Sequence, residues 1–360
     1  MINALNYFLA FIELGSQYEK SRLDSRWFVP FNLSTTTKEA STRFEIRVVR
    51  EGIIFTYTLV FNRTRILQEK LEHILSLPSR MQNRLLFNRV WHEDKAAYTI
   101  TNGKDFGDVY KEIQESLRED EPFMSLLATR LNVEVVKPFT SWLTVKWPSV
   151  GLGEEQFEYE AAARSLQKNV PVMLEPVTQI IRRFDTGIAK IDIEESEDKH
   201  SDGRQKFKVW VWHEADGKKF RWRMEEESTG TQRLFSLAVK ILFAFRLGSL
   251  LLIDELGSNI HPNITRAIVR MFQSEKTNPN RAQLIFTSHD NTLQRGNLLR
   301  RDQVWFTQKR EDGSTELYSL SDFRPRNDLA IDKAYLDGRF GAVPVLPDEE
   351  ELLQPAGTTK

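Results

Sequence analysis

Hydrophobic and polar positions follow two different spacings along the chain, and the spacing changes from segment to segment. Near the start, four apolar residues recur at the spacing of a helix face: Ile2, Leu5, Leu9 and Ile12. This pattern predicts a helix over the first 15 residues. Residues 44–61 are instead β-branched and aromatic on both sides of Glu51-Gly52, a pair typical of tight turns. They predict a hairpin of two strands.

The middle of the chain is less regular. From residue 68 to residue 131 the pattern is helical and uneven, and we interpret this stretch as an inserted helical region. Residues 142–147 predict a strand, and residues 174–185 predict a helix that ends before Gly187.

An antiparallel meander of three strands is predicted next. The strand-like segments are residues 188–195, 206–215 and 218–227. The last two alternate around Asp216-Gly217, a strong tight-turn pair. The charged segment 195–205 is predicted to be a solvated loop, and its His200 is a weak metal candidate.

After the meander, helices alternate with unbroken apolar strands. The predicted order is helix, strand, helix and strand, over residues 230–245, 249–253, 262–272 and 283–287. A helix between two buried strands is typical of a right-handed parallel crossover. The predicted fold class is therefore α/β, with a parallel core sheet, an antiparallel β meander and an inserted helical region.

Composition narrows the class of protein. The 360 residues carry 50 Lys+Arg against 51 Asp+Glu, a formal charge of −1, and 40% of them are hydrophobic. This balance is that of a globular domain, excludes a disordered or fibrous chain, and argues against a generally basic surface for nucleic acid. The most apolar stretch, residues 234–253, contains Lys240 and Arg246, so no membrane span is predicted.

The chain has no cysteine, which excludes disulfides, thiolate zinc sites and a cysteine nucleophile. The absence of cysteine fits a reducing compartment, so we expect a cytoplasmic protein. Trp210 and Trp212 alternate with valines, which favours strand packing over a surface that stacks nucleic-acid bases.

The first of three polar clusters lies at the start of the predicted helix after the meander. It contains the run Ser228, Thr229, Gly230, Thr231 and Gln232. Hydroxyls, a glycine and the free N–H groups of a helix start can bind an anion. The alternative is a simple cap of an amphipathic helix. The acidic run at residues 225–227 is interpreted as a solvated approach to this cluster.

The other two clusters end the two predicted parallel strands. Asp254 and Glu255 follow the first, where an Asp can hold Mg²⁺ and the next Glu can polarise the water that attacks a γ-phosphate. An acidic helix cap would look the same. Ser288, His289 and Asp290 end the second strand, and His289 can reach a phosphate there unless it is a structural histidine. The element order predicts that all three clusters share one sheet edge.

Together the clusters resemble the ABC-type ATPase head shared by SMC, RecF and overcoming-lysogenization-defect proteins. In this resemblance, residues 228–232 are the signature motif, residues 250–255 the Walker B motif and His289 the switch histidine. The similarity extends over most of the chain. It is greatest to AAA-family ATPases labelled abortive phage-resistance or predicted ATP-binding proteins, which end in segments like QVWFTQK and DKAYLDGRFGAVP.

The resemblance implies ATP and Mg²⁺ as ligands and a homodimer in which two heads enclose ATP. Ser228, Gly230, Thr231 and Gln232 would then meet the nucleotide from the partner head. Asp254 would bind Mg²⁺, Glu255 would activate water and His289 would sense the γ-phosphate. The output would be antiphage defence through a separately encoded nuclease or toxin.

Two departures from the family pattern matter. The motif G-x-x-x-x-G-K-[ST] is absent, because Gly103-Lys104 and Gly217-Lys218 lack its other residues. In the family the P-loop precedes a helix that resembles MINALNYFLAF. We therefore expect the loop and its strand just before Met1. We favour a misplaced start codon or truncated gene over genuine loss of the P-loop. Without them the sheet would have a gap and the chain would bind ATP poorly. Also, the segment GSNIHP after Walker B alters the loop that contacts the partner head.

The predicted organisation is an N-terminal ATPase lobe at 1–67, a helical insertion at 68–185, a C-terminal ATPase lobe at 186–346 and a disordered tail at 347–360. Two other functions stay open. One is a scaffold without nucleotide chemistry that binds a partner protein. The other is a DNA-repair type of ATPase, for which Arg182-Arg183 and Arg300-Arg301 would contact phosphates.

Overall fold

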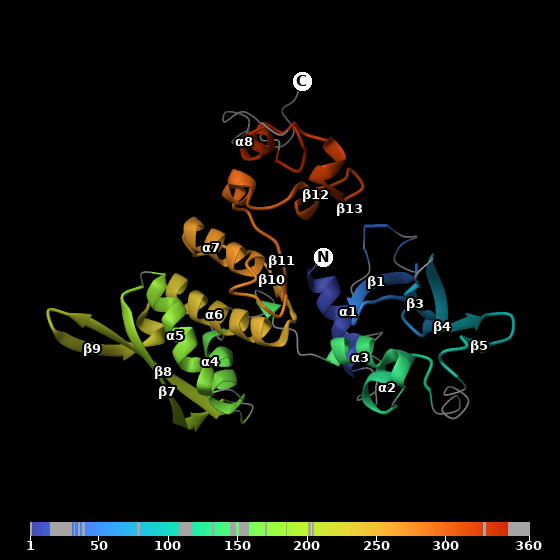
Figure 1. The fold of residues 1–360 in the computed structure, drawn as a ribbon, viewed down its shortest axis with the longest axis horizontal. Coiled ribbons are helices and arrows are strands. Elements are labelled where there is room, and N and C mark those ends of the chain that lie inside the picture. Colours follow the sequence, from blue (N-terminus) through green and yellow to red (C-terminus); the bar gives the residue numbers. More distant parts are fainter. Residues whose placement is uncertain are drawn as a thin grey trace.

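A computed structural model of the protein describes residues 2–14, 31, 33–34, 37, 40–77, 80–107, 117–131, 133–144, 149–150, 158–169, 171–184, 186–200, 203, 205–326 and 329–344. Within these residues the strands form four sheets, and helices pack against each of them (Figure 1). The chain is mixed α/β, which confirms the predicted fold class.

The N-terminal sheet is antiparallel, with its strands in chain order. They are β1 (Thr42–Arg50), β2 (Ile53–Phe61), β3 (Ile66–Leu77), β4 (Arg80–His92) and β5 (Ala97–Asn102). The predicted hairpin is β1–β2, and its turn residues Glu51 and Gly52 have φ of 52° and 77°, the left-handed values that such turns need.

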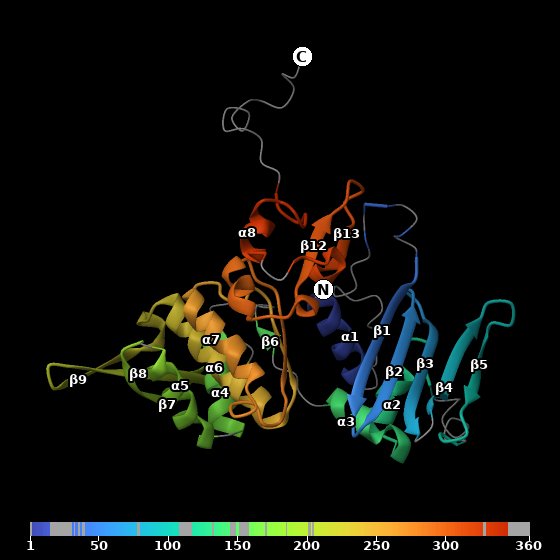
Figure 2. The ribbon, with the colours of Figure 1, turned by 45° about the horizontal axis from the view of Figure 1, so that its top comes forward.

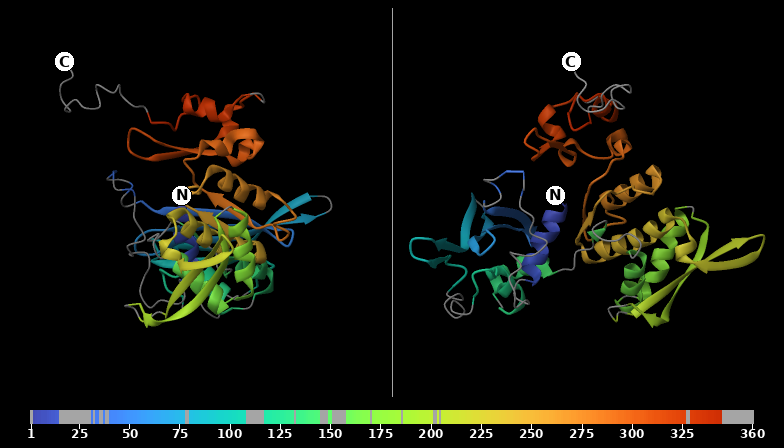
Figure 3. Two further views of the ribbon diagram at one scale, coloured as in Figure 1. Left: turned by 90° about the vertical axis from the view of Figure 1, so that its left-hand side faces the viewer. Right: turned by 180° about the vertical axis from the view of Figure 1, so that it is seen from behind.

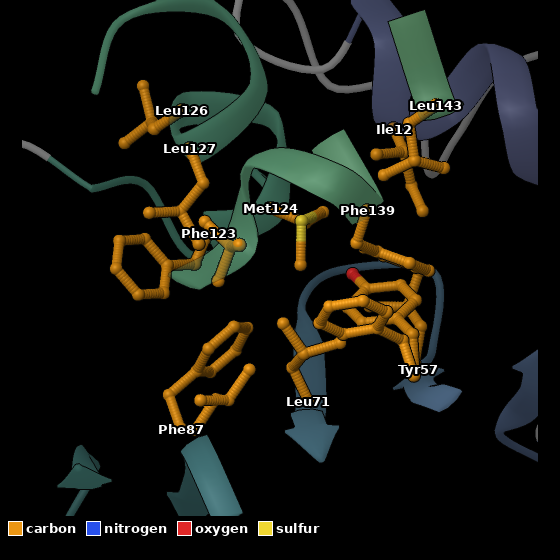
Figure 4. Close-up of a cluster of buried hydrophobic side chains, with 14 of the residues drawn as sticks. Ile12, Tyr57, Leu71, Phe87, Phe123, Met124, Leu126, Leu127, Phe139 and Leu143 are labelled. Carbon is orange, nitrogen blue, oxygen red and sulfur yellow. The ribbon is translucent and has the colours of Figure 1, made fainter. Parts of the chain in front are cut away.

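Three helices cover one face of this sheet (Figure 2). They are α1 (Ile2–Leu14), α2 (Phe123–Thr129) and α3 (Lys137–Thr144). Figure 4 shows the core between them: Ile12, Phe123 and Phe139 from the helices approach Tyr57 and Phe87 from the strands. The predicted first helix is confirmed.

The helical prediction for residues 68–131 is wrong over most of its length, because residues 66–102 form β3, β4 and β5. Leu, Glu, Lys and Gln in β3 are good helix formers, and tertiary pairing overrides that preference. Among the described residues of the stretch, α2 is helical as predicted, and residues 108–116 lie outside the described residues. The predicted strand at 142–147 is also wrong where it is described, since Trp142 and Leu143 belong to α3 and point into its core with Phe139.

A buried carboxylate fixes α2 to the sheet. Glu69 on β3 accepts hydrogen bonds from the N–H groups of Phe123 and Met124, both 2.7 Å, and from the Tyr57 hydroxyl at 2.8 Å. Arg89 on β4 lies 3.8 Å from it. Burial raises the pKa of Glu69 despite this cation.

The meander is β7 (Ile188–Lys199), β8 (Gln205–Ala215) and β9 (Lys218–Arg223), all antiparallel, as predicted. Asp216 and Gly217 form its tight turn with φ of 51° and 71°. The predicted loop at 195–205 is shorter than expected, because β7 continues to Lys199 and pairs with Gln205 beyond a register shift.

Three helices pack on the meander: α4 (Glu158–Asn169), α5 (Leu174–Arg183) and α6 (Thr229–Leu247). One side of α6 enters this core through Phe235 and Val239, and its other side enters the core of the parallel sheet through Leu237 and Ile241. The helix is therefore buried on both sides, which explains its apolar sequence.

The parallel sheet has the order β11 (Gln283–Phe286), β10 (Leu250–Ile253) and β6 (Ser149–Val150). α7 (Pro262–Gln273) connects β10 to β11, which confirms the predicted crossover. Every residue of β10 is buried, whereas β11 is partly exposed. Leu5 of α1 packs on Leu250 and Leu252 of β10 and also belongs to the edge of the N-terminal core.

The C-terminal elements form a group at one end of the molecule, drawn in orange and red in Figure 3. They are the 3₁₀ segment η6 (Asn291–Asn297), the hairpin β12 (Trp305–Lys309) and β13 (Thr315–Ser319), and α8 (Ile331–Leu336). Phe306, Ala334 and Phe340 form their small core. The predicted disordered tail, 347–360, lies outside the described residues.

Candidate functional site

The start of α6 is capped from within. The Ser228 Oγ accepts a hydrogen bond from the Thr231 N–H at 3.1 Å and lies 2.9 Å from the Thr231 Oγ1. The Gln232 side-chain amide donates to the carbonyls of Glu227, at 2.9 Å, and Glu225, at 3.3 Å. The first amides of a helix have no acceptor within it, so Thr229 and Gly230 direct N–H groups out of this end.

Gly230 is required by packing inside the chain. A Cβ atom at this position would lie 2.4 Å from the carbonyl oxygen of Asn259, in the loop that follows the Asp254-Glu255 pair. From the sequence, Gly230 is expected to take part in binding an anion at the helix start. In the structure, the close approach is that of the chain's own backbone.

Asp254 and Thr287 join the ends of the two parallel strands. The Thr287 hydroxyl donates to the Asp254 Oδ1 at 2.6 Å and accepts from the Glu255 N–H at 2.8 Å. The Leu256 N–H donates to the Thr287 carbonyl at 2.8 Å. These bonds hold the Asp254 carboxylate at the carboxyl edge of the sheet.

Glu255 has a left-handed backbone, with φ of 55°, and such a conformation in a residue other than glycine is a common mark of functional sites. Its Oε2 accepts from the Ser258 hydroxyl at 2.9 Å, and its Oε1 lies 3.5 Å from the Nε2 of His289. The side chains of Glu255 and His289 are 52% and 89% exposed, so their ion pair contributes little to stability. Both groups are open to a ligand.

Arg233, one turn into α6, links the start of α6 to the turn at Asp254 and Glu255. Its Nη2 donates to the carbonyls of Asp254, at 3.2 Å, and Glu255, at 2.9 Å. The sequence argument missed both Arg233 and Thr287. The available signals were a cation inside an otherwise apolar helix and a hydroxyl directly after an apolar strand.

The acidic run before α6 is solvated at Glu225 and Glu226, as predicted, whereas Glu227 is largely shielded from solvent. Glu225 forms an ion pair with Arg223 at 3.0 Å, and Glu226 accepts from the Arg223 N–H at 3.2 Å. Glu227 accepts from the Trp222 indole N–H at 2.8 Å and lies 2.7 Å from the Nε2 of His213. Each carboxylate braces the turn before Ser228.

These contacts connect all three clusters at one edge of the parallel sheet. Gly230 touches the loop after Glu255, Arg233 bonds to the turn at Asp254, and His289 lies beside Glu255. The start of α6 and the carboxyl ends of β10 and β11 therefore lie close together. In α/β sheets this edge is where ligands bind.

A protein-family model described as "AAA domain, putative AbiEii toxin, Type IV TA system" matches residues 2–294. The chain belongs to this AAA family. The match confirms the resemblance to AAA-type and ABC-type ATPase heads that the sequence motifs suggested.

Among solved structures, the AAA chain is similar to one titled "Crystal structure of the SmcHead bound to the C-winged helix domain of ScpA". The identity is 11%, the TM-score is 0.28, and the similarity covers 72% of this chain and 76% of that one. A comparison with curated proteins gives no match.

AAA and ABC ATPases generally use ATP and Mg²⁺, and the residues at the sheet edge fit both. Mg²⁺ is commonly held by one or two carboxylates together with phosphate oxygens, and Asp254 keeps acceptor capacity beyond its bond to Thr287. The amides at the start of α6 are donors suited to phosphate. Among the described residues, no group of three His, Cys, Asp or Glu side chains could hold a metal by itself.

The remaining candidates of the sequence have partners of their own. His200 lies 3.0 Å from Glu160, and Arg300 donates to both oxygens of Asp302 at 3.0 and 2.8 Å. Trp210 and Trp212 lie on the outer face of the meander, with Arg221 over both rings, while the valines between them fill the core. Both indoles pack under Arg221 of the neighbouring strand and donate to Glu194 and Asp192 of β7, which agrees with the strand-packing interpretation. No helix in the described part of the chain combines the length and apolar character needed to cross a bilayer.

Proposed function

We propose that this AAA-family chain is an ATP-binding and ATP-hydrolysing head that acts as a nucleotide-dependent switch. The observation that carries the proposal is the cluster of Asp254, Glu255 and His289 at the carboxyl ends of two parallel strands, braced by Arg233 from the helix that starts beside them. Family membership supports the same assignment.

Each group has a role that its surroundings favour. Asp254 holds Mg²⁺, which neutralises phosphate charge when bound. Glu255 accepts a proton from the attacking water, since its side chain is 52% exposed and lies beside His289. His289 donates from its imidazole to the γ-phosphate or to that water. In the partner head, Ser228, Gly230, Thr231 and Gln232 present a positive helix end to the nucleotide.

The proposal requires a phosphate cradle beside β11. The sequence contains no P-loop, and among the described strands β11 pairs only with β10. Leu284, Ile285 and Phe286 are apolar yet partly exposed on β11, while the neighbouring β10 is fully buried. A further parallel strand beside β11 would cover them and bring a phosphate loop to the same edge.

In this proposal two copies of the head enclose ATP, and hydrolysis opens the pair. The protein works in the cytoplasm. The output is antiphage defence through a separately encoded nuclease or toxin, which the toxin-type description of the family favours.

The test is steady-state ATP hydrolysis by an N-terminally extended chain that carries the upstream segment, compared with its Glu255→Gln form. Removing the base should lower kcat by about 10²–10⁴-fold. Glu311→Gln, an exposed carboxylate in the β12–β13 turn, serves as the matched control and should keep the full rate. Equal rates for wild type and Glu255→Gln would remove the assigned base, and absence of any hydrolysis by the extended chain would favour the scaffold function.

A further inference from the structure

Among the side chains that hold the turn before α6 to the meander, Glu227 is the one that bonds to both β8 and β9. Its carboxylate accepts from the Trp222 indole at the end of β9 and from the His213 Nε2 at the end of β8, at 2.8 and 2.7 Å. A carboxylate only accepts hydrogen bonds, so the Nε2 of His213 carries the hydrogen. We call Glu227, His213 and Trp222 the carboxylate clamp.

The clamp is compact and largely shielded from solvent. The His213 ring stacks on the Trp222 indole with centroids 4.2 Å apart and planes 9° from parallel. The side chains of His213 and Glu227 are 17% and 10% exposed. The Nε2 of His213 and the indole N–H of Trp222 both bond to the Glu227 carboxylate, and they hold it in one direction, toward the meander.

That direction matters because Glu227 directly precedes the α6 cap. The free N–H groups at a helix start attract nearby anions. Along the sequence, the carboxylate closest to the cap residue Ser228 is that of Glu227. If released, it would compete with phosphate for those groups. Its backbone carbonyl also receives the Gln232 amide, so movement of Glu227 would disturb the cap itself.

We propose that His213 and Trp222 are positioning residues that hold the Glu227 carboxylate on the meander and so keep the start of α6 open to phosphate. The consequence for catalysis rests on the proposed ATPase function. The positioning itself does not, and it can be measured without nucleotide.

The first experiment is hydrogen exchange of the full chain in the absence of ATP, followed in peptides that span residues 224–235. His213→Phe keeps a ring on Trp222 but removes the donor, and exchange in these peptides should become about tenfold faster through local opening. His213→Gln retains a donor near the Nε2 position and should stay within about threefold of wild type. Glu227→Gln, which keeps an acceptor for Trp222, serves as a second variant should His213→Phe fail to fold.

The chain offers a matched control in another His–Glu pair. His200 lies 3.0 Å from Glu160, with side chains 17% and 19% exposed, and it packs between β7 and α4 rather than at α6. His200→Phe should leave exchange at residues 224–235 unchanged. An equal effect of His200→Phe and His213→Phe, or no effect of His213→Phe, would overturn the proposal.

The second experiment measures ATP hydrolysis by the extended chain. His213→Phe should raise the KM for ATP by about tenfold with kcat changed less than threefold, because the freed carboxylate competes with phosphate. The double variant His213→Phe/Glu227→Gln should recover the wild-type KM, since the amide carries no charge. An inactive wild type would refute the proposed function and leave the exchange result standing, whereas a raised KM that Glu227→Gln does not recover would refute the competition.

Discussion

Arg233 shows how much of the site depends on one buried side chain. It leaves α6 and donates to two successive carbonyls, those of Asp254 and Glu255. These carbonyls belong to the turn in which Glu255 takes its left-handed backbone. Because a planar guanidinium fixes the direction of its donors, Arg233 sets the distance between α6 and the turn at Asp254 and Glu255.

Replacing Arg233 by Met should therefore destabilise the protein. Met fills a similar volume but leaves the two carbonyls without their donor, and we expect a loss of about 1–3 kcal/mol in the free energy of unfolding. Urea denaturation of the wild type, Arg233→Met and Arg233→Lys measures it. Lys keeps the charge without the fork and should recover only part of the loss. Full recovery by Lys would show that charge, not geometry, holds the turn.

Gly230→Ala tests the contact between α6 and the loop at Asn259. The added Cβ would meet the Asn259 carbonyl oxygen at 2.4 Å, so the loop must shift, and we expect a loss of about 1–3 kcal/mol in unfolding free energy. Thr229→Ala, at the exposed neighbouring position, should change stability by less than about 0.5 kcal/mol. A gain in stability for Gly230→Ala, as for an unhindered helical glycine, would contradict the contact.

At the scale of elements, α8 is held to the segment that follows His289. Asp332 of α8 forms a hydrogen-bonded ion pair with Arg295 of η6, and Arg266 of α7 donates to the carbonyls of Thr292 and Arg295. The hydrogen bond from Arg295 lowers the pKa of the Asp332 carboxyl below its usual range. The C-terminal elements are thus attached to the end of the strand that carries His289.

Asp332→Asn should show a pH-dependent loss of stability. A carboxyl whose pKa is lowered by folding stabilises the native state above the unfolded pKa, about 3.9, and loses this contribution as pH falls through the folded pKa. We expect the melting temperature of Asp332→Asn to lie about 2–4 °C below wild type at pH 7, and the two to converge below about pH 4. Thermal melts across this range measure it, and a constant difference would exclude the ion pair as the cause.

The elements that sequence could predict are those with a local signal. The two tight turns have Glu51-Gly52 and Asp216-Gly217, whose left-handed backbone is a property of the pair itself. The helices α6 and α7 have apolar residues at helical spacing and the strand β10 is an unbroken apolar run, and the structure confirms these elements.

The elements that sequence missed depend on distant partners. In β3, Glu69 lies inside a stretch of good helix formers, and what fixes it as a buried strand residue is the start of α2, 54 residues away. The residues of the candidate site divide in the same way, into those with a local signal and those whose contacts are distant in sequence. Asp254, Glu255 and His289 end recognisable strands, whereas the contacts of Arg233, Thr287 and Glu227 join segments that no local pattern connects.

At the scale of the whole molecule, the proposed function requires two copies. We expect the extended chain with Glu255→Gln, which binds but does not hydrolyse ATP, to form a dimer with ATP and to stay a monomer with ADP or without nucleotide. Light scattering after size-exclusion chromatography measures the mass. Ser228→Arg, which places a bulky side chain at the α6 cap, should prevent the dimer. A mass that does not respond to ATP would contradict a switch based on dimerisation.

Helix α1 lies between the two main sheets, and Leu5 contacts both the N-terminal core and the buried strand β10. A deletion that removes α1 would therefore uncover apolar surface on two bodies at once. Such a shortened protein should aggregate when expressed, so truncations designed to separate the two lobes need to retain residues 2–14.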